Sequence, residues 1–133
     1  MEVEVCRDGH VYKQRYERGK TMYPLRIEGD CEAGQTGTRV HFMPDGTIFE
    51  ETIFDYDTLK QRFREMAFLT KGLKIILTDT REGQERTDTF HYEGGIKEFV
   101  KYLNRSKESL YPEIIYCEGR KDSVEVEVAM QHN

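Results

Sequence analysis

The stretch from residue 57 to residue 77 reads DTLKQRFREMAFLTKGLKIIL and carries the strongest structural signal in the chain. Its apolar residues recur at the i, i+4, i+7 and i+8 spacing of one helix face: Leu59, Phe63, Met66 and Ala67. This spacing predicts a core-facing helix over residues 58–70, with Asp57 as its N-cap and Gly72 as its end. Apolar residues then recur at every second position from Leu73 to Leu77, so we expect the helix to lead directly into a β-strand.

Short segments with period-two alternation lie on both sides of this stretch. The first two form a hairpin around the Asp8-Gly9 turn, and others follow at residues 25–27, 38–42, 86–92, 113–118 and 124–130. A second, short helix is predicted where apolar residues fall at i, i+3, i+4 and i+7: Ile96, Phe99, Val100 and Leu103. The sequence therefore predicts an α+β fold, in which a mixed, mostly antiparallel sheet carries two amphipathic helices on one face and a hairpin follows at the C-terminus.

Length and composition narrow the class of protein. The 133 residues correspond to one domain, or to one domain plus a fragment, and 20 basic against 25 acidic residues give a net charge of −5. This weak acidity excludes a strongly basic nucleic-acid-binding module. No apolar run is long enough to span a membrane, and the first residues lack a secretory signal. We therefore expect a cytoplasmic protein with no membrane contact.

The chain has few residue clusters that could form a complete metal or catalytic site. Three cysteines lie far apart without a C-x-x-C pair, which predicts reduced thiols rather than a zinc site or a disulfide framework: Cys6, Cys31 and Cys117. His91 and Glu93 share one strand face but have no third metal ligand. Asp55 and Asp57 could bind a metal or share a proton, although their place before a helix favours capping. We expect no metal site and no catalytic residue in the chain.

Four segments match a known set of motifs in order: TGTRVHFMPD at 36–45, RFREMAFLTKG at 62–72, FHYEGGI at 90–96 and VEVAMQ at 126–131. Together they resemble the B subunits of bacterial type IIA topoisomerases. The FHYEGG run is closer to the gyrase branch, and the topoisomerase IV branch is the alternative. The resemblance implies a partial ATPase fold of the gyrase, Hsp90, histidine kinase and MutL type over residues 1–104. It also implies the start of a transducer domain over residues 105–133.

The resemblance assigns few functional residues to this chain. The family's catalytic Glu, magnesium-binding Asn, adenine-binding Asp and phosphate lid would all lie before Met1. ATP and Mg²⁺ are therefore expected as cofactors of a longer parent protein and should bind poorly to these residues alone. Thr38 matches the family's threonine beside the adenine, and Val40 on the same strand face would help form the pocket wall. Arg7 aligns with an arginine at the pocket mouth that contacts aminocoumarin inhibitors.

From the residues alone, simpler interpretations stay open. Thr38 could be an ordinary strand residue after a glycine turn, and Arg7 could be a solvated residue beside the Asp8-Gly9 turn. Five basic residues cluster on and after the predicted helix, where a solvated face is expected and direct DNA contact is the alternative: Lys60, Arg62, Arg64, Lys71 and Lys74.

The resemblance also implies a function and partners. The parent protein would be an ATP-dependent type II DNA topoisomerase with supercoiling activity. Its partners would be the remainder of the B subunit, the gyrase A subunit and double-stranded DNA. A protein of another class is the competing hypothesis, namely an independent, non-enzymatic protein-binding module. Such a module would use its open sheet face for a protein partner. The hairpin that ends in the strand at residues 124–130 instead favours a fragment: a lone two-stranded ribbon is marginal in water, so we expect its partner strands to be missing from this chain.

Overall fold

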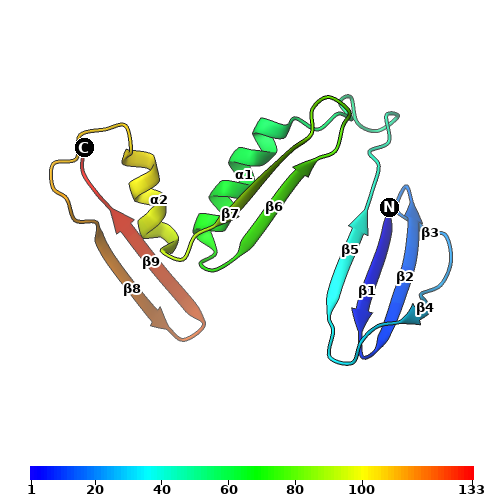
Figure 1. Cartoon of the computed structure of the whole chain (residues 1–133). Helices are drawn as coiled ribbons and strands as arrows, with labels where there is room; N and C mark the ends of the chain where they lie inside the picture. The colour runs from blue at the N-terminus through cyan, green and yellow to red at the C-terminus, as the bar shows by residue number, and fades with distance from the viewer. The chain divides into compact units, whose positions relative to one another are not determined.

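The computed structural model describes residues 1–133, which divide into two compact units, Met1–Ile53 and Phe54–Asn133 (Figure 1). The strands are distributed over three sheets, and every strand pair is antiparallel. Two helices complete the structure, so the predicted α+β class with mostly antiparallel strands is confirmed. Neither helix combines the length and apolar character that crossing a membrane requires.

The first unit is a five-stranded antiparallel sheet. Its strands are β1 (Glu2–Arg7), β2 (His10–Glu17), β3 (Lys20–Thr21), β4 (Arg26–Asp30) and β5 (Gly37–His41). They follow the order β3-β2-β1-β5, and β4 pairs with β2 as well. The predicted opening hairpin is confirmed: Asp8 and Gly9 have φ angles of 53° and 79°, the two positive values that a type I′ turn requires.

A disulfide in the first unit corrects one expectation from the sequence. Cys6 and Cys31 are bonded, with their Cα atoms 6.3 Å apart, so the prediction of three reduced thiols is wrong for this pair. The two residues come together because β1 pairs with β2 and β4 pairs with β2 in turn, which brings the ends of β1 and β4 to the same region. Spacing along the chain does not show this proximity. Cys117 is free and exposed.

The second unit holds both helices and two hairpins. Its elements are α1 (Tyr56–Leu69), β6 (Lys74–Asp79), β7 (Arg86–His91), α2 (Gly95–Asn104), β8 (Ile115–Lys121) and β9 (Val124–Met130). Helix α1 packs along the β6–β7 hairpin, and α2 contacts both α1 and β9 (Figure 1). The predicted domain boundary after residue 104 stays a prediction.

Helix α1 begins two residues earlier than the sequence suggested. Its N-cap is Asp55, whose Oδ1 accepts a hydrogen bond of 2.7 Å from the backbone N–H of Thr58. Asp57, the predicted N-cap, lies in the first turn instead, where a carboxylate complements the positive end of the helix dipole. Both aspartates have the right chemistry, and the chain places the one that precedes Tyr56 at the cap because Tyr56 is itself buried in the first turn.

The buried face of α1 also differs from the prediction. Ala67 is fully buried as expected, but Met66 is 50% exposed, and Tyr56 and Phe68 are buried in its place. The packed side of α1 thus keeps Leu59 and Phe63, both half-buried, and extends past them to Lys60 and Arg64, which are also half-buried. The reason is that Lys60 and Arg64 find polar partners on β7 and α2, which lets these long side chains lie on the packed side of the helix.

The core of the second unit centres on one aromatic ring. Phe68 is 2% exposed, and its ring stacks on Tyr92 at a centroid distance of 3.6 Å. The rings of Phe99 and Tyr102 from α2 lie 5.1 Å and 5.4 Å from it. This cluster joins α1, α2 and the segment after β7, so it positions the second unit's elements relative to each other.

Candidate functional site

The three residues singled out from the sequence lie on one face of the first sheet. In the pairing of β1 with β5, Val5 is opposite Thr38 and Val3 is opposite Val40. Directly opposed residues of an antiparallel pair share a face, and alternate residues of one strand share it too. Arg7 is two positions beyond Val5 on β1 and therefore belongs to the same face, at the end of the strand.

The side chains around Thr38 on this face are mostly small and apolar. Val3, Val5 and Val40 carry no polar side-chain atoms, and Tyr12 on β2 is opposite Val5 on the other side of β1. Thr38 is exposed and Val40 is 54% exposed, so the face is open within this unit. The face also carries polar side chains from β2, because Gln14 is opposite Val3, so the Thr38 hydroxyl is one polar group beside three valines. Such a patch suits a flat, apolar group that needs one hydrogen-bond partner.

Arg7 stands apart from this patch. Its side chain is 74% exposed, and its Nε lies 3.5 Å from Asp8 Oδ2 in the adjacent turn. An exposed ion pair of this kind contributes little to stability. The guanidinium is therefore available to a ligand that extends past the end of the strand.

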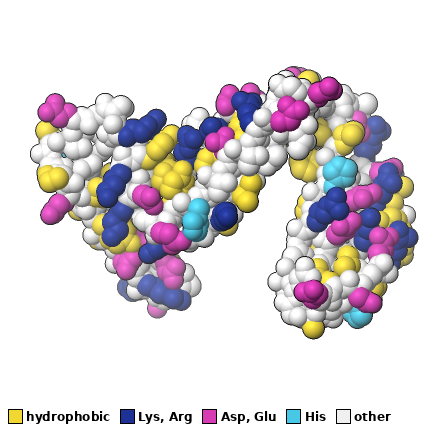
Figure 2. Space-filling model, in the orientation of Figure 1, with side chains coloured by type: hydrophobic (Ala, Val, Ile, Leu, Met, Phe, Trp, Pro, Cys, Tyr) yellow, Lys and Arg dark blue, Asp and Glu magenta, His cyan; other side chains and the backbone are white.

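The opposite face of the sheet is charged (Figure 2). Lys13 Nζ lies 3.3 Å from Glu4, 3.4 Å from Glu28 and 3.7 Å from Glu2. The pKa of Lys13 is raised, chiefly by its hydrogen bond to Glu4 and then by the charges of Glu28 and Glu2. Side chains from β1, β2 and β5 line a hollow of about 200 Å³ here: Glu2, Glu4, Lys13, Arg39 and His41. The alternation of the strands thus separates a solvated ion-pair face from the apolar face with Thr38.

The segment after β5 is held by a cluster that sequence reasoning missed. Asp45 Oδ2 accepts a hydrogen bond of 2.5 Å from Arg18 Nε, and Asp45 Oδ1 accepts from the backbone N–H and the hydroxyl of Thr47 at 2.9 Å and 2.7 Å. These donors, Arg18 first, lower the pKa of Asp45 to about 2. Arg18 itself sits in the β2–β3 turn. The cluster ties that turn to the chain that leaves β5, and the only sequence signal for it was the Pro44-Asp45-Gly46 turn.

The basic residues of α1 are engaged within the second unit. Lys60 Nζ lies 2.8 Å from Asp88 Oδ2, and Arg64 Nη1 donates to the Tyr102 hydroxyl at 2.7 Å. Arg62 pairs with Glu65 one turn along the helix at 3.2 Å. The predicted solvated face therefore applies to Arg62, whereas Lys60 and Arg64 flank a groove of about 360 Å³ between α1 and α2.

Potential metal ligands are dispersed over the chain. No group of three or more His, Cys, Asp or Glu side chains is close enough to hold a metal ion. His91 Nε2 and Glu93 Oε1 are 2.7 Å apart and form a pair. The geometry does bring the candidate residues Thr38, Val40 and Arg7 to one face of the first sheet.

Comparison with known proteins gives strong matches to one kind of protein, although no family model matches. The DNA gyrase B subunit of Clostridium acetobutylicum is 53% identical over 133 residues, which is 99% of this chain and 20% of the relative. The DNA gyrase B subunit of Halalkalibacterium halodurans is 52% identical over 134 aligned positions, which cover 100% of this chain and 21% of the relative. The chain thus spans about a fifth of the length of these curated relatives.

A solved structure agrees with the sequence comparison. The chain is similar to the 43K ATPase domain of Thermus thermophilus gyrase B, crystallised in complex with an aminocoumarin. The TM-score is 0.85 and the identity 37%, and the match covers 96% of this chain and 34% of the other. Sequence and fold therefore lead to the same relatives.

Proposed function

The chain is homologous over its whole length to the B subunit of DNA gyrase, and we propose that it is a segment of the ATP-binding B subunit of a DNA-supercoiling type II topoisomerase. The observation that carries this proposal is the 53% identity that extends over 99% of the chain. Identity at this level over 133 residues is far beyond a shared fold alone, so a shared role in the parent protein is the natural inference.

Within that subunit, the segment would form the adenine-side wall of the nucleotide pocket. The apolar face of Val3, Val5 and Val40 would contact the flat base, and the Thr38 hydroxyl would donate to or accept from its polar edge. The loop at residues 31–36 and the Asp45 cluster lie at either end of β5 and would hold the strand in position. A purine would suit this face, and the triphosphate would lie beyond it.

Mg²⁺ and the phosphates would be held by the rest of the B subunit, and the role of this segment would be limited to the base end of ATP. When ATP is bound, its hydrolysis supplies the free energy that drives the parent's cycle. The apolar face around Thr38 would orient the base and exclude water from it.

The second unit would serve as the junction between the ATPase domain, ending near residue 104, and the transducer domain. Asn104 Nδ2 donates to Gln131 Oε1 at 3.0 Å, and Gln131 Nε2 donates to the carbonyl of Tyr111 at 2.9 Å. These bonds connect the end of α2, the connector and the end of β9. A rigid connection at this point would let movement of one domain reach the other. The gyrase A subunit and double-stranded DNA would be the parent's further partners, and aminocoumarins its inhibitors.

Two measurements test the proposal. The protein that contains this segment, combined with its A subunit, should introduce supercoils into relaxed circular DNA only when ATP is present. Decatenation without supercoiling would instead identify a topoisomerase IV. The 133 residues by themselves should show no ATP turnover above a protein-free blank, because they lack a general base and phosphate ligands. Turnover that persists after removal of contaminating ATPases would contradict this assignment.

A protein-binding module remains the second candidate because β9 exposes apolar side chains. Val124 is 61% exposed and Val126 is 54% exposed. The reading frame before Met1 distinguishes the two functions. A frame that continues upstream through a glycine-rich phosphate lid supports the topoisomerase, and a ribosome-binding signal at Met1 supports the independent module.

A further inference from the structure

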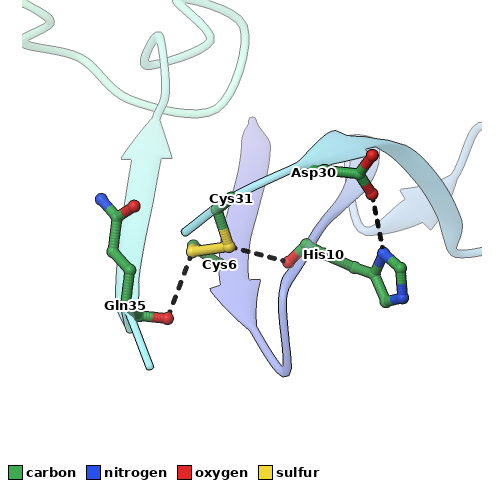
Figure 3. Close-up of a disulfide and its surroundings, with 5 residues drawn as sticks. All are labelled: Cys6, His10, Asp30, Cys31 and Gln35. Atoms are coloured by element: carbon green, nitrogen blue, oxygen red, sulfur yellow. Dashed lines mark hydrogen bonds and ion pairs between the residues drawn. A yellow bond between two sulfur atoms is a disulfide. The ribbon is translucent and has the colours of Figure 1, made fainter. Parts of the chain in front are cut away.

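We propose that Cys6 and Cys31 form a reversible thiol–disulfide exchange site that fixes the loop between β4 and β5. The two sulfur atoms are bonded, and both residues are only half-buried, so a small thiol can reach them (Figure 3). The third cysteine, Cys117, is free and belongs to the other compact unit. The inference concerns the oxidation state of this chain and does not depend on the proposed function.

Cys6 anchors both ends of the loop. Its side chain is bonded to Cys31, where the loop begins, and its backbone pairs with Gly37, where β5 begins. The loop between them contains an internal hydrogen bond of 3.0 Å from the Gln35 N–H to the Glu32 carbonyl. Breaking the sulfur–sulfur bond would therefore weaken the attachment at the start of the loop to its backbone contacts and leave the sheet itself intact.

The surroundings accommodate both oxidation states. Cys6 Sγ lies 3.3 Å from the Gln35 carbonyl oxygen, and Cys31 Sγ lies 3.5 Å from the His10 carbonyl oxygen (Figure 3). A disulfide sulfur has no hydrogen, so these are close contacts in the bonded state. After reduction each S–H would find a carbonyl acceptor already within reach. Reduction would therefore leave neither S–H without an acceptor, which favours exchange without refolding.

The backbone near the bond is also anchored independently of it. The Cys31 N–H donates to the Gly9 carbonyl at 3.0 Å, and His10 Nδ1 lies 3.0 Å from Asp30 Oδ1. These contacts keep Cys31 close to the β1–β2 turn when the bond is open. The thiols would then stay near each other, which favours re-formation of the bond over mixed disulfides.

A low-molecular-weight thiol supplies the electrons and protons that reduction of the bond requires. Two equivalents of a low-molecular-weight thiol reduce the Cys6–Cys31 bond, giving two cysteine thiols and one disulfide of the small thiol. In the first step the thiolate attacks one sulfur and a mixed disulfide forms, while the other cysteine leaves as a thiolate and takes a proton. A second thiolate then displaces the remaining cysteine. The reverse sequence, with the oxidised small molecule as the electron acceptor, restores the bond.

Differential alkylation of the folded full chain tests the site. In buffer without added thiol, only Cys117 should be alkylated, and after native dithiothreitol treatment all three cysteines should react. Returning the reduced chain to oxidised glutathione should protect Cys6 and Cys31 again. The Cys117→Ser variant should behave identically at the pair, whereas Cys6→Ser should leave Cys31 reactive in both buffers.

Two results would overturn the exchange site. Alkylation of Cys6 and Cys31 as complete as that of Cys117 under oxidising conditions would mean that no bond forms. A bond that opens only in denaturant would mean that it is not exchangeable in the folded chain. Serine is nearly isosteric with cysteine and can donate to the same carbonyls, so the variants should fold.

Hydrogen exchange tests the loop-fixing role separately. Backbone amides of residues 32–36 should exchange several-fold faster in the reduced chain than in the oxidised chain, while those of β1 and β2 stay unchanged. The Cys31→Ser variant should show the faster rates in both buffers. Equal rates for the loop in the two oxidation states would overturn the role assigned to the bond.

Discussion

Lys60 Nζ on α1 lies 2.8 Å from Asp88 Oδ2 on β7, so a lysine joins the helix to the hairpin beneath it. The same carboxylate oxygen accepts a hydrogen bond of 2.8 Å from the Tyr56 hydroxyl, one helical turn earlier. One turn later, Arg64 donates to Tyr102 on α2. The packed side of α1 therefore combines two buried aromatic residues, Tyr56 and Phe68, with a row of polar contacts between them.

Replacing Asp88 with asparagine should lower the urea midpoint of the second unit. Asparagine keeps the shape but removes the charge that Lys60 faces. In the parent sequence, hydrogen bonds from Lys60 and then from Tyr56 lower the pKa of Asp88. The stabilisation that the Asp88 carboxylate provides is therefore present above the ordinary aspartate pKa and is lost on acidification. The variant should accordingly lose stability at pH 7 and differ less from the parent sequence near pH 3. Glu65→Gln, which affects the exposed pair with Arg62, is the control and should have a negligible effect.

Truncating Phe68 to alanine should cost about 3–5 kcal/mol of unfolding free energy, because it opens a cavity in an aromatic cluster. Leu69 is the matched control, since it is the next residue on α1 but is 60% exposed. Its replacement by alanine should cost less than about 1 kcal/mol. Denaturant unfolding followed by far-UV circular dichroism measures both. Similar losses for the two variants would mean that Phe68 is not the centre of the core.

Acid should destabilise both units through two aspartates. Hydrogen bonds from Arg18 and Thr47 lower the pKa of Asp45 to about 2, and those from Arg81 lower the pKa of Asp79 to about 2. Both values lie below the unfolded value of about 3.9, so the unfolded chain binds protons first as the pH falls. Their stabilisation is complete above about pH 4 and is lost as the pH drops through about 2.

Variants with asparagine at either position identify these two groups. Asp45→Asn and Asp79→Asn should each be less stable than the parent sequence at pH 6 and should show a flatter dependence on pH between 5 and 2. Urea midpoints over this range provide the measurement. An unchanged acid slope in both variants would assign the acid sensitivity to other carboxyl groups.

Thr38→Val in the intact B subunit should weaken nucleotide binding. Valine preserves the shape of threonine and removes the hydroxyl, which would leave a polar partner of the adenine unpaired. The expected loss is about 1–3 kcal/mol, or roughly one to two decades in KM for ATP. Thr38→Ser keeps the hydroxyl and should stay close to the parent sequence. If Thr38→Val leaves KM unchanged, the assignment to the adenine pocket is wrong.

Arg7→Ala in the same intact protein should weaken inhibition by aminocoumarins and leave ATP turnover almost unchanged. The Arg7 side chain is largely exposed at the end of β1, where a base seated on the apolar face would not need it. ATP turnover should stay within a few-fold of the parent sequence, whereas aminocoumarin inhibition should weaken because the planar guanidinium is lost. Arg7→Lys should not restore inhibition, since an ammonium lacks the planar fork. Equal loss of turnover and inhibition would place Arg7 in the nucleotide site itself.

The sequence by itself determined the local elements and the family. The Asp8-Gly9 hairpin, the existence of α1 and α2, and the antiparallel hairpins all follow from periodicity and turn residues a few positions apart. Four motifs in the family's order were enough to identify the family, because together they span most of the chain. Alternation along β1 and β5 was also enough to predict that Thr38 and Val40 share a face.

Only the tertiary structure decided which residues meet across long separations. The Cys6–Cys31 bond spans 25 residues, Arg18 reaches Asp45 across 27, and Lys60 reaches Asp88 on another element. The packed side of α1 extends from the predicted stripe toward Lys60 and leaves Met66 half-exposed. Hydrophobic spacing predicts the apolar stripe of a helix but not whether the basic residues beside it also pack. Lys60 can pack because the facing strand supplies a carboxylate, and only the pairing of distant segments places Asp88 there.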